Sequence, residues 1–113
     1  MPAVAEQALV ESEMTDGLVI SVATLIDLWY VSQTTQAVTA TELDTIRTML
    51  DASTAVAFEP MSVDIADATT SIPWDLLKEP WDRFIVATAL TFGLPLVTRD
   101  ESIRQSDLVA TIW

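Results

Sequence analysis

Apolar residues recur along the chain with two different periods, and the alternation between these periods predicts alternating strands and helices. Short continuous apolar runs that come after turn signals are typical of buried parallel strands. Such runs predict four strands, over residues 18–21, 55–59, 94–98 and 108–113. Apolar positions at helical spacing predict five helices, over residues 4–13, 22–33, 39–50, 62–68 and 79–92 with their caps included.

Several residues mark where these helices begin and end. Thr39 followed by Glu42 is a capping box, and Pro80 stands in a first helical turn, where its missing N–H is not needed. Gly93 is the expected left-handed residue after the last predicted helix. Strands that alternate with helices over short connections form parallel sheets with helices on their faces. The sequence therefore predicts an α/β, three-layer fold with a parallel sheet of about four strands flanked by helices.

Composition limits the chemistry that the chain can perform. Cysteine and histidine are both absent from the 113 residues, so carboxylates are the obvious groups for catalysis. The chain has 17 acidic and 5 basic residues, a net charge of −12, which excludes nucleic-acid binding by general electrostatic attraction. Any anion has to be met by the four bases of the C-terminal third, although each of them taken alone is better explained as solvated surface charge: Lys78, Arg83, Arg99 and Arg104.

The sequence predicts a soluble, cytoplasmic protein with no membrane partner. Residues 1–13 are acidic and lack the basic and apolar regions of a signal peptide. The apolar run over residues 18–31 is shorter than the about 20 residues that a membrane span needs.

Three aspartates are expected at one edge of the sheet, because ligands of an open α/β sheet bind outside the carboxyl ends of its strands. Asp27 is a lone charge in the helix that comes after strand 18–21. Asp82 lies in the first turn of the helix leading into strand 94–98, and Asp100 comes two residues after that strand. Converging carboxylates repel one another unless a cation lies between them, and hard oxygen ligands favour Mg²⁺ or Mn²⁺. A metal held in this way activates water for hydrolysis without histidine or cysteine.

Each aspartate also has a purely structural interpretation. Asp82 complements the dipole of its helix, Asp100 is an N-cap, and Asp27 forms a salt bridge with one of the few arginines. These alternatives stay open for each residue taken singly, whereas the three together favour a shared site.

Two segments resemble PIN-domain proteins of the VapC toxin type. The segment EPWDRFIVATALTFGLPLVTRDESI (79–103) resembles the C-terminal signature of this family, in which an acid-Pro-x-Asp-Arg helix precedes a strand ending in Thr-x-Asp. The segment ISVATLIDLWY (20–30) resembles a second family segment, in which a serine at a strand end precedes a helical acid by six residues. Ser21 and Asp27 match this spacing, and the similarity spans residues 3–113.

The resemblance implies a Mg²⁺- or Mn²⁺-dependent endoribonuclease that forms a homodimer and is paired with a VapB-like antitoxin. The second, third and fourth acids of the family, which bind metal and catalyse, match Asp27, Asp82 and Asp100. Supporting positions match Thr98, the hydroxyl beside the last acid, and Ser21. Contacts to RNA phosphate are implied for Arg83 and Arg99.

The first strand and the first acid of the family have no counterpart in this sequence. In the related fold that strand is central, between strands 18–21 and 94–98, so we expect unpaired backbone groups and an apolar gap there. Either the two strands close up, or another chain supplies a strand, or the protein starts upstream. We favour the third, with an apolar strand ending in Asp encoded before Met1. Residues 1–113 are then a single PIN-like domain, incomplete at the N-terminus, with weak or no nuclease activity.

The leading functional hypothesis is a VapC-like toxin that cuts a structured RNA with bound Mg²⁺ or Mn²⁺. The alternative is a catalytically inactive remnant that acts only in protein–protein binding, to an antitoxin or to its own copy. A third interpretation, a phosphatase-like metal hydrolase, is weaker because the Asp-x-Asp motif of such enzymes is not present.

Overall fold

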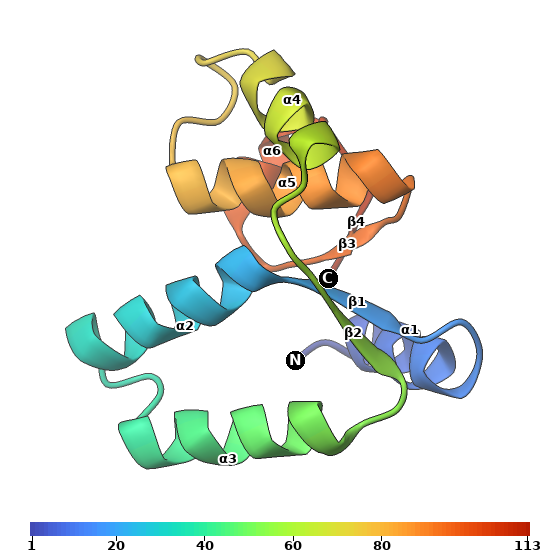
Figure 1. Cartoon of the computed structure of the whole chain (residues 1–113), viewed down its shortest axis with the longest axis vertical. Coiled ribbons are helices and arrows are strands. Elements are labelled where there is room, and N and C mark those ends of the chain that lie inside the picture. The colour runs from blue at the N-terminus through green and yellow to red at the C-terminus, as the bar shows by residue number, and fades with distance from the viewer.

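Strands and helices alternate in the computed structural model, which describes all residues, 1–113 (Figure 1). The strands are β1 (Leu18–Ser21), β2 (Val56–Glu59), β3 (Leu96–Val97) and β4 (Thr111–Ile112). The helices are α1 (Ala3–Met14), α2 (Val22–Thr34), α3 (Ala40–Ala52), α4 (Val63–Ser71), α5 (Pro80–Phe92) and α6 (Glu101–Ser106). The predicted α/β order is confirmed, and α6 is an element that apolar periodicity did not indicate. No helix combines the length and the apolar character needed to cross a membrane.

Helix ends coincide with the cap residues that the sequence contains. The Thr39 hydroxyl accepts from the backbone N–H of Glu42, and the Glu42 carboxylate accepts from the backbone N–H of Thr39, so the capping box of α3 is complete. α5 begins after Glu79, whose carboxylate accepts from the backbone N–H of Asp82 at 2.8 Å. Gly93 ends α5 with φ 63°, a left-handed conformation that glycine adopts at low cost.

The four strands are parallel and are divided between two separate sheets. β1 pairs with β2 in a register that joins Leu18 to Val56, and β3 pairs with β4 in a register that joins Leu96 to Thr111. The predicted parallel strands and flanking helices are therefore present, but β1 and β3 do not pair with each other. Each of these two strands has a partner on one side only.

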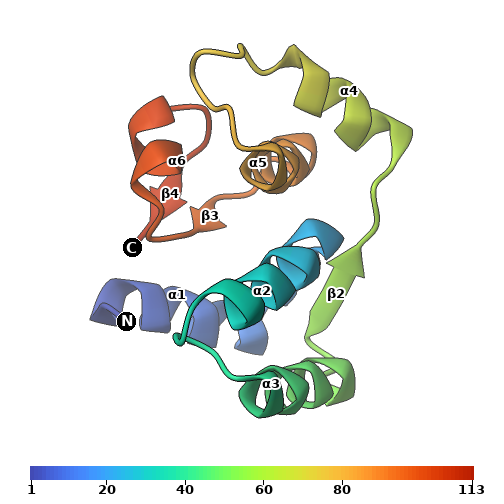
Figure 2. The same ribbon diagram turned by 90° about the vertical axis from the view of Figure 1, so that its left-hand side faces the viewer.

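The chain consists of two halves that lie one above the other in Figure 2. The N-terminal half (residues 1–59) contains α1, α2, α3, β1 and β2, and the C-terminal half (residues 63–113) contains the remaining elements. The hydrophobic core lies in the C-terminal half and consists of Ile65, Ile72, Leu77, Val86, Ala87 and Ile103. The buried residues of the N-terminal half are Ala5, Ser21 and Ala23. Contacts of α2 with α5, and of α1 with β4, join the halves.

Candidate active site

The three predicted acids lie on helices that adjoin the carboxyl ends of β1 and β3. Asp27 is in the second turn of α2, which continues from β1 without a break, and Asp82 is in the first turn of α5. Asp100 is the N-cap of α6 and comes three residues after β3 ends. The Asp100 carboxylate therefore stands at the same strand ends as Asp27.

Electrostatic coupling shows that these acids are neighbours. The pKa of Asp82 is raised to about 6, first by partial burial and then by the negative charges of Asp100, Glu79 and Asp27. The pKa of Asp27 is also raised, by partial burial first and then by Glu79 and Asp100. The charges of Glu79 and Asp100 thus act on both Asp27 and Asp82, although the four residues belong to three different helices and their caps. We call Asp27, Glu79, Asp82 and Asp100 the acidic cluster.

Glu79 is the member of the cluster that sequence reasoning missed. The sequence pattern indicates this residue only as part of a helix start, and it does cap α5 through its carboxylate. Its charge nevertheless raises the pKa of both Asp27 and Asp82. The signal was present in the sequence, because a carboxylate three residues before Asp82 must lie within one helical turn of it.

The acidic cluster has no basic partner. The one ion pair in the chain joins Arg47 Nε to Asp51 Oδ1 at 3.0 Å, on the exposed surface of α3. The interpretation of Asp27 as half of a salt bridge is therefore wrong. Partial burial is the main reason why the pKa values of Asp27 and Asp82 are raised, and the charges of the neighbouring carboxylates raise them further because no cation lies nearby.

Local hydrogen bonds fix the hydroxyl and carboxylate groups around the cluster. Asp100 Oδ1 accepts from the backbone N–H of Ile103 at 2.9 Å, so the N-cap interpretation of Asp100 is confirmed. Thr98 Oγ1 accepts from the backbone N–H of Asp100 at 3.1 Å, and Ser21 Oγ accepts from that of Ala23 at 3.2 Å. Thr98 and Ser21 thus shape the turns that carry Asp100 and the start of α2.

Arg83 does not face the solvent as a phosphate-binding residue would. Only 8% of its surface is exposed, and its guanidinium donates to the carbonyl oxygens of four residues in the last turn of α4 and in the segment between α4 and α5: Thr69, Ile72, Pro73 and Leu77. The implied phosphate contact of Arg83 is therefore corrected to a structural role. The sequence did not predict this structural role, because the acceptors are backbone carbonyl groups, which every residue has and which the pattern of side chains therefore does not indicate.

The remaining C-terminal bases are exposed. Arg99 directly precedes Asp100, and Lys78 directly precedes Glu79, so each adjoins a member of the acidic cluster. Arg104 lies on α6, the helix that Asp100 caps. These three side chains are free of ion pairs.

The donor chemistry of the acidic cluster fits a hard divalent cation, because oxygen ligands are gathered without basic partners. Asp27, Asp82 and Asp100 are the residues that would hold it, with Asp100 Oδ2 free of hydrogen bonds from the protein. The arrangement is not complete, since no three carboxylates are close enough together to ligate one ion. A full ligand set needs closer approach of these acids or a further oxygen donor.

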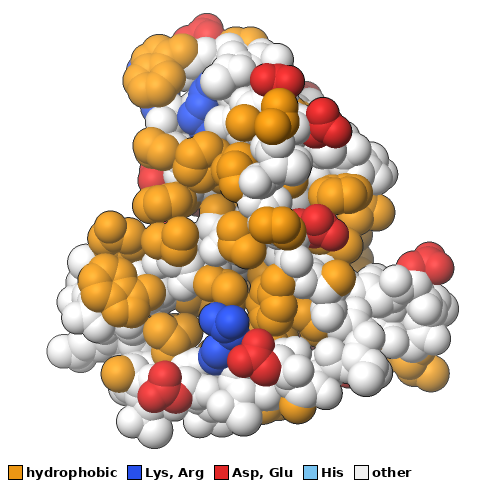
Figure 3. Space-filling view, viewed as in Figure 1, with side chains coloured by type: hydrophobic (Ala, Val, Ile, Leu, Met, Phe, Trp, Pro, Cys, Tyr) orange, Lys and Arg blue, Asp and Glu red, His pale blue; other side chains and the backbone are white.

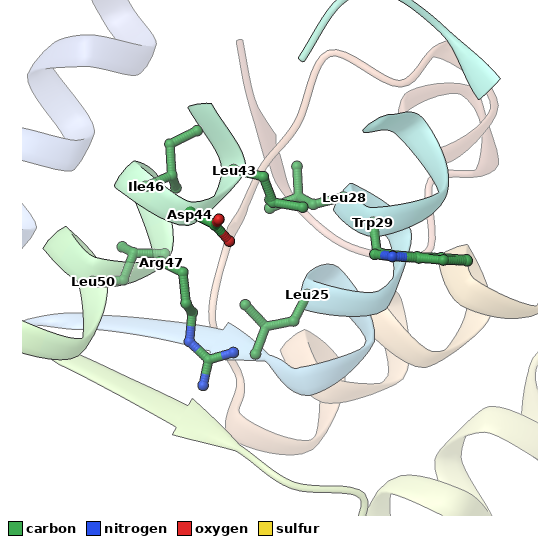
Figure 4. Close-up of a pocket in the computed structure, with 8 residues that line it drawn as sticks. All are labelled: Leu25, Leu28, Trp29, Leu43, Asp44, Ile46, Arg47 and Leu50. Atoms are coloured by element: carbon green, nitrogen blue, oxygen red, sulfur yellow. The ribbon is translucent and has the colours of Figure 1, made fainter. Parts of the chain in front are cut away.

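A second surface feature is a groove between α2 and α3. It has a volume of about 220 Å³ and is lined by apolar side chains of both helices: Leu25, Leu28 and Trp29 from α2, and Leu43, Ile46 and Leu50 from α3. Figure 4 shows Leu28 and Leu43 meeting between the two helices. Asp44 and Arg47 also line it. Figure 3 shows hydrophobic side chains along α2 and between α2 and α3 on this face, and Trp29 is 51% exposed. The groove is an apolar surface that this chain leaves uncovered.

Comparisons with known proteins agree with this architecture. A family model described as PIN domain matches residues 2–108. A comparison with curated proteins gives no match. A chain in the crystal structure of VapBC2 from Rickettsia felis, bound to a DNA fragment from the VapBC2 promoter, is similar in fold to this chain. The TM-score is 0.71 and the sequence identity 14%, and the match covers 97% of this chain and 84% of that chain. Because the family model covers nearly all of the residues and the fold agrees, the chain belongs to the PIN domain family.

Proposed function

We propose that the protein is a metal-dependent endoribonuclease and the toxin component of a toxin–antitoxin pair. Membership of the PIN domain family and the fold shared with VapBC2 support the nuclease and toxin assignments. The observation that carries the proposal is the acidic cluster, which has no basic partner and in which partial burial, together with the neighbouring carboxylates, raises the pKa of Asp82 to about 6.

Asp27, Asp82 and Asp100 are proposed to hold Mg²⁺ or Mn²⁺. When bound, such an ion supplies polarisation of a phosphoryl oxygen and a water of lowered pKa. The protein holds Asp100 in place through the N-cap bond and the Thr98 turn, and it holds Asp82 in place through the Glu79 cap. Arg83 fixes the segment before α5, so it positions Asp82 without contact to substrate.

Arg99 is proposed to contact the RNA phosphate backbone. It is exposed and adjacent to Asp100, and a guanidinium matches the geometry of phosphate oxygens. Lys78 and Arg104 are near enough in the sequence to the cluster to extend this contact. Because these three bases lie beside the four acids of the acidic cluster, the net local charge does not attract RNA over a long range. The bases are expected to hold the substrate by direct local contacts.

Two protein partners are also proposed. An apolar segment of an antitoxin is proposed to bind in the α2–α3 groove, because this groove is apolar and exposed. None of its lining residues belongs to the acidic cluster. A second copy of the chain covers the other exposed face of α2, where Ile26 and Tyr30 are 41% and 46% exposed.

Titration with Mn²⁺ tests the proposal independently of catalytic rate. We expect Asp82→Asn and Asp100→Asn each to abolish binding while the fold is kept, because asparagine replaces either carboxylate sterically and also serves as an N-cap. Asp16→Asn is the matched control, since Asp16 lies exposed in the turn before β1, at the opposite strand ends. Binding by either variant as tight as in the parent would disprove the shared metal site.

RNA cleavage in Mg²⁺, with EDTA as control, then separates the nuclease from the alternative of an inactive, partner-binding domain. Cleavage that depends on Asp82 supports the nuclease. Antitoxin binding without any cleavage supports the binding domain. Full cleavage by the 113-residue chain shows in addition that three aspartates suffice, against the expectation that this chain is a weak nuclease.

A further inference from the structure

Four aromatic rings form a continuous series of contacts that crosses from α2 to α5. The ring centroids of Trp29 and Tyr30 are 5.1 Å apart, and those of Tyr30 and Trp81 are 6.2 Å apart. Phe84 meets Trp81 edge-on, with 5.7 Å between the centroids. α2 and α5 belong to different halves of the molecule and lie one above the other in Figure 2. We call these four residues the aromatic array.

The aromatic array is not part of the hydrophobic core. The six residues of the core are all aliphatic, although the chain has eight aromatic residues. Trp29 and Tyr30 are 51% and 46% exposed, and Trp81 and Phe84 are partly exposed. Single exposed apolar side chains are common, whereas a contiguous group of them indicates a binding surface. The array is therefore a surface that can receive a flat, apolar group.

The aromatic array lies beside the acidic cluster, on the same two helices. Trp81 directly precedes Asp82, and Tyr30 comes one helical turn after Asp27, on the same face of α2. Consecutive side chains of a helix point about 100° apart, so Trp81 adjoins the cluster without pointing into it. A nucleotide also directs its phosphate and its base to different sides of the sugar. The arrangement thus suits a phosphate at the acids and a base on the ring.

The net charge of the chain makes contacts of this kind necessary. At −12 the protein does not attract nucleic acid by its overall charge, so interactions that do not depend on charge have to supply part of the affinity. Stacking of a base on an aromatic ring is such an interaction, and it accepts every base because each has a flat face. Bases inside a duplex are already stacked on one another, so only an unpaired base is available.

Trp81 is the exposed ring of the array that neither proposed protein partner uses. Trp29 lines the α2–α3 groove, and Tyr30 lies on the face of α2 assigned to a second copy. We infer that Trp81 is a specificity-determining residue, whose ring stacks on an unpaired base next to the RNA phosphate at the acidic cluster. Tyr30 and Phe84 hold this ring in place through their contacts with it. The inference rests on the proposed nuclease function.

Binding of an end-labelled RNA strand of mixed sequence, measured by fluorescence anisotropy, tests the role of Trp81. Ca²⁺ replaces Mg²⁺ so that a hard cation is present and binding is measured apart from cleavage. Trp81→Leu is expected to bind the single strand at least about fivefold more weakly, since stacking on one base is lost. Trp81→Phe keeps a ring and is expected to keep most of the affinity.

Two controls accompany these variants. Phe92→Leu removes a ring that is 46% exposed at the opposite end of α5, and it is expected to bind as the parent does. The same RNA annealed to its complement offers no unpaired base, so it is expected to bind more weakly and without a difference between Trp81→Leu and the parent.

Two further measurements separate stacking from a structural effect of the substitution. Trp81→Leu removes no charge and should leave the salt dependence of binding unchanged, whereas Arg99→Leu should reduce it. The chain has four tryptophans, so the indole N–H signal that disappears from the NMR spectrum in Trp81→Phe identifies Trp81. In the unchanged chain this signal is expected to shift with the single strand, while that of Trp74 stays in place. If Trp81→Leu does not fold, this shift decides.

Light scattering shows whether Trp81 belongs to a contact between copies of the chain. Trp81→Leu is expected to have the same mass in solution as the parent. A lower mass would overturn the inference, because the ring would then belong to the interface between copies.

Other results bear on the inference and on the nuclease separately. Unchanged affinity of Trp81→Leu, equal weakening by Phe92→Leu, or equal binding of the single strand and the duplex would overturn the stacking role alone, provided that RNA still binds or is cleaved in an Asp82-dependent manner. If the unchanged chain neither binds nor cleaves RNA, the proposed function fails together with the inference.

Discussion

At the scale of single residues, Asp82 and Arg83 are adjacent in the sequence and have opposite roles. Asp82 adds its charge to a group of acids and is raised in pKa to about 6. Arg83 turns inward and donates to backbone carbonyls, with only 8% of its surface exposed. On a helix, consecutive side chains point about 100° apart. Asp82 and Arg83, although they form one charged pair in the sequence, therefore lie in two separate environments.

We predict that Arg83→Leu lowers the free energy of unfolding by at least about 3 kcal/mol, because it leaves several buried carbonyl oxygens without a donor. Arg99→Leu, at an exposed position, is expected to change it by less than about 0.5 kcal/mol. Urea denaturation at neutral pH measures both. Equal effects of the two substitutions would contradict the structural role of Arg83.

The raised pKa of Asp82 predicts a specific pH dependence of stability. Its pKa is about 6 in the folded protein and near 3.8 when the surroundings exert no effect, so the folded state binds the proton more tightly. The free energy of unfolding therefore rises as the pH falls through this window, and the gain is complete below the lower pKa. Since Asp82 is partly exposed, solvent screening reduces the gain to roughly 1 kcal/mol.

Urea denaturation of Asp82→Asn and of the parent across the same pH range isolates this contribution. The variant is expected to be more stable than the parent near neutral pH and to lose the advantage in acid. Protonation of the other acids at low pH reduces the repulsion due to the net charge of −12 in both proteins alike. This effect therefore cancels when the free energies of unfolding of the two proteins are subtracted. A constant difference between the two curves would contradict the assignment to Asp82.

At the scale of elements, the sequence predicted the features that depend on local signals. The Thr39 capping box, the start of α5 at Pro80 and its end at Gly93 are where the pattern placed them, because caps act within one turn. The strand predicted over residues 94–98 is limited in the structure to the two residues of β3, because the length of a strand depends on its pairing with β4 and not on the apolar run alone. The missing pairing of β1 with β3 is likewise a property of two distant segments, which no single run can reveal.

Two glycines with positive φ provide a test at this scale. A Cβ added to Gly17 (φ 87°) would lie 2.6 Å from the backbone oxygen of Ala55, whereas one added to Gly93 (φ 63°) would meet nothing within 4 Å. Gly93→Ala is therefore expected to cost only the backbone strain, about 1 kcal/mol. Gly17→Ala adds displacement of the chain before β2 and is expected to cost more than about 2 kcal/mol.

Thermal and urea denaturation of the two alanine variants measure this difference. The control is internal, because both substitutions are chemically identical and both replace a left-handed glycine. Equal destabilisation by the two substitutions would mean that the backbone at Ala55 moves away from the added Cβ of residue 17 without a measurable loss of stability.

At the scale of the whole molecule, burial is unevenly distributed. The core of six buried residues lies between Ile65 and Ile103, and the N-terminal half contributes mainly partly exposed apolar surface. Local patterns predicted the α/β alternation along the whole chain, but not that the core would lie in the C-terminal half, since burial is decided by how elements pack together. The exposed apolar surface of α2 is therefore the natural place for further association.

We predict a homodimer at micromolar concentration, formed through α2. Light scattering should give twice the 12.4 kDa mass of the chain, and Tyr30→Glu should shift it to the monomer. Val63→Glu is the matched control, because Val63 is 76% exposed at the start of α4, in the other half. A stable monomer of the unchanged chain, or dissociation by Val63→Glu as well, would contradict an interface on α2.

The position of the core has a consequence for how the chain is made. A ribosome releases the N-terminal half first, yet the residues that bury most side chains lie between Ile65 and Ile103. The emerging segment carries the apolar face of α2 before α5, which packs on it, has been made, so cooperative folding has to wait until α6 has left the exit tunnel. Nascent chains stalled before Ile103 should be cleaved readily by protease and bound by chaperones, and release of the completed chain should abolish both.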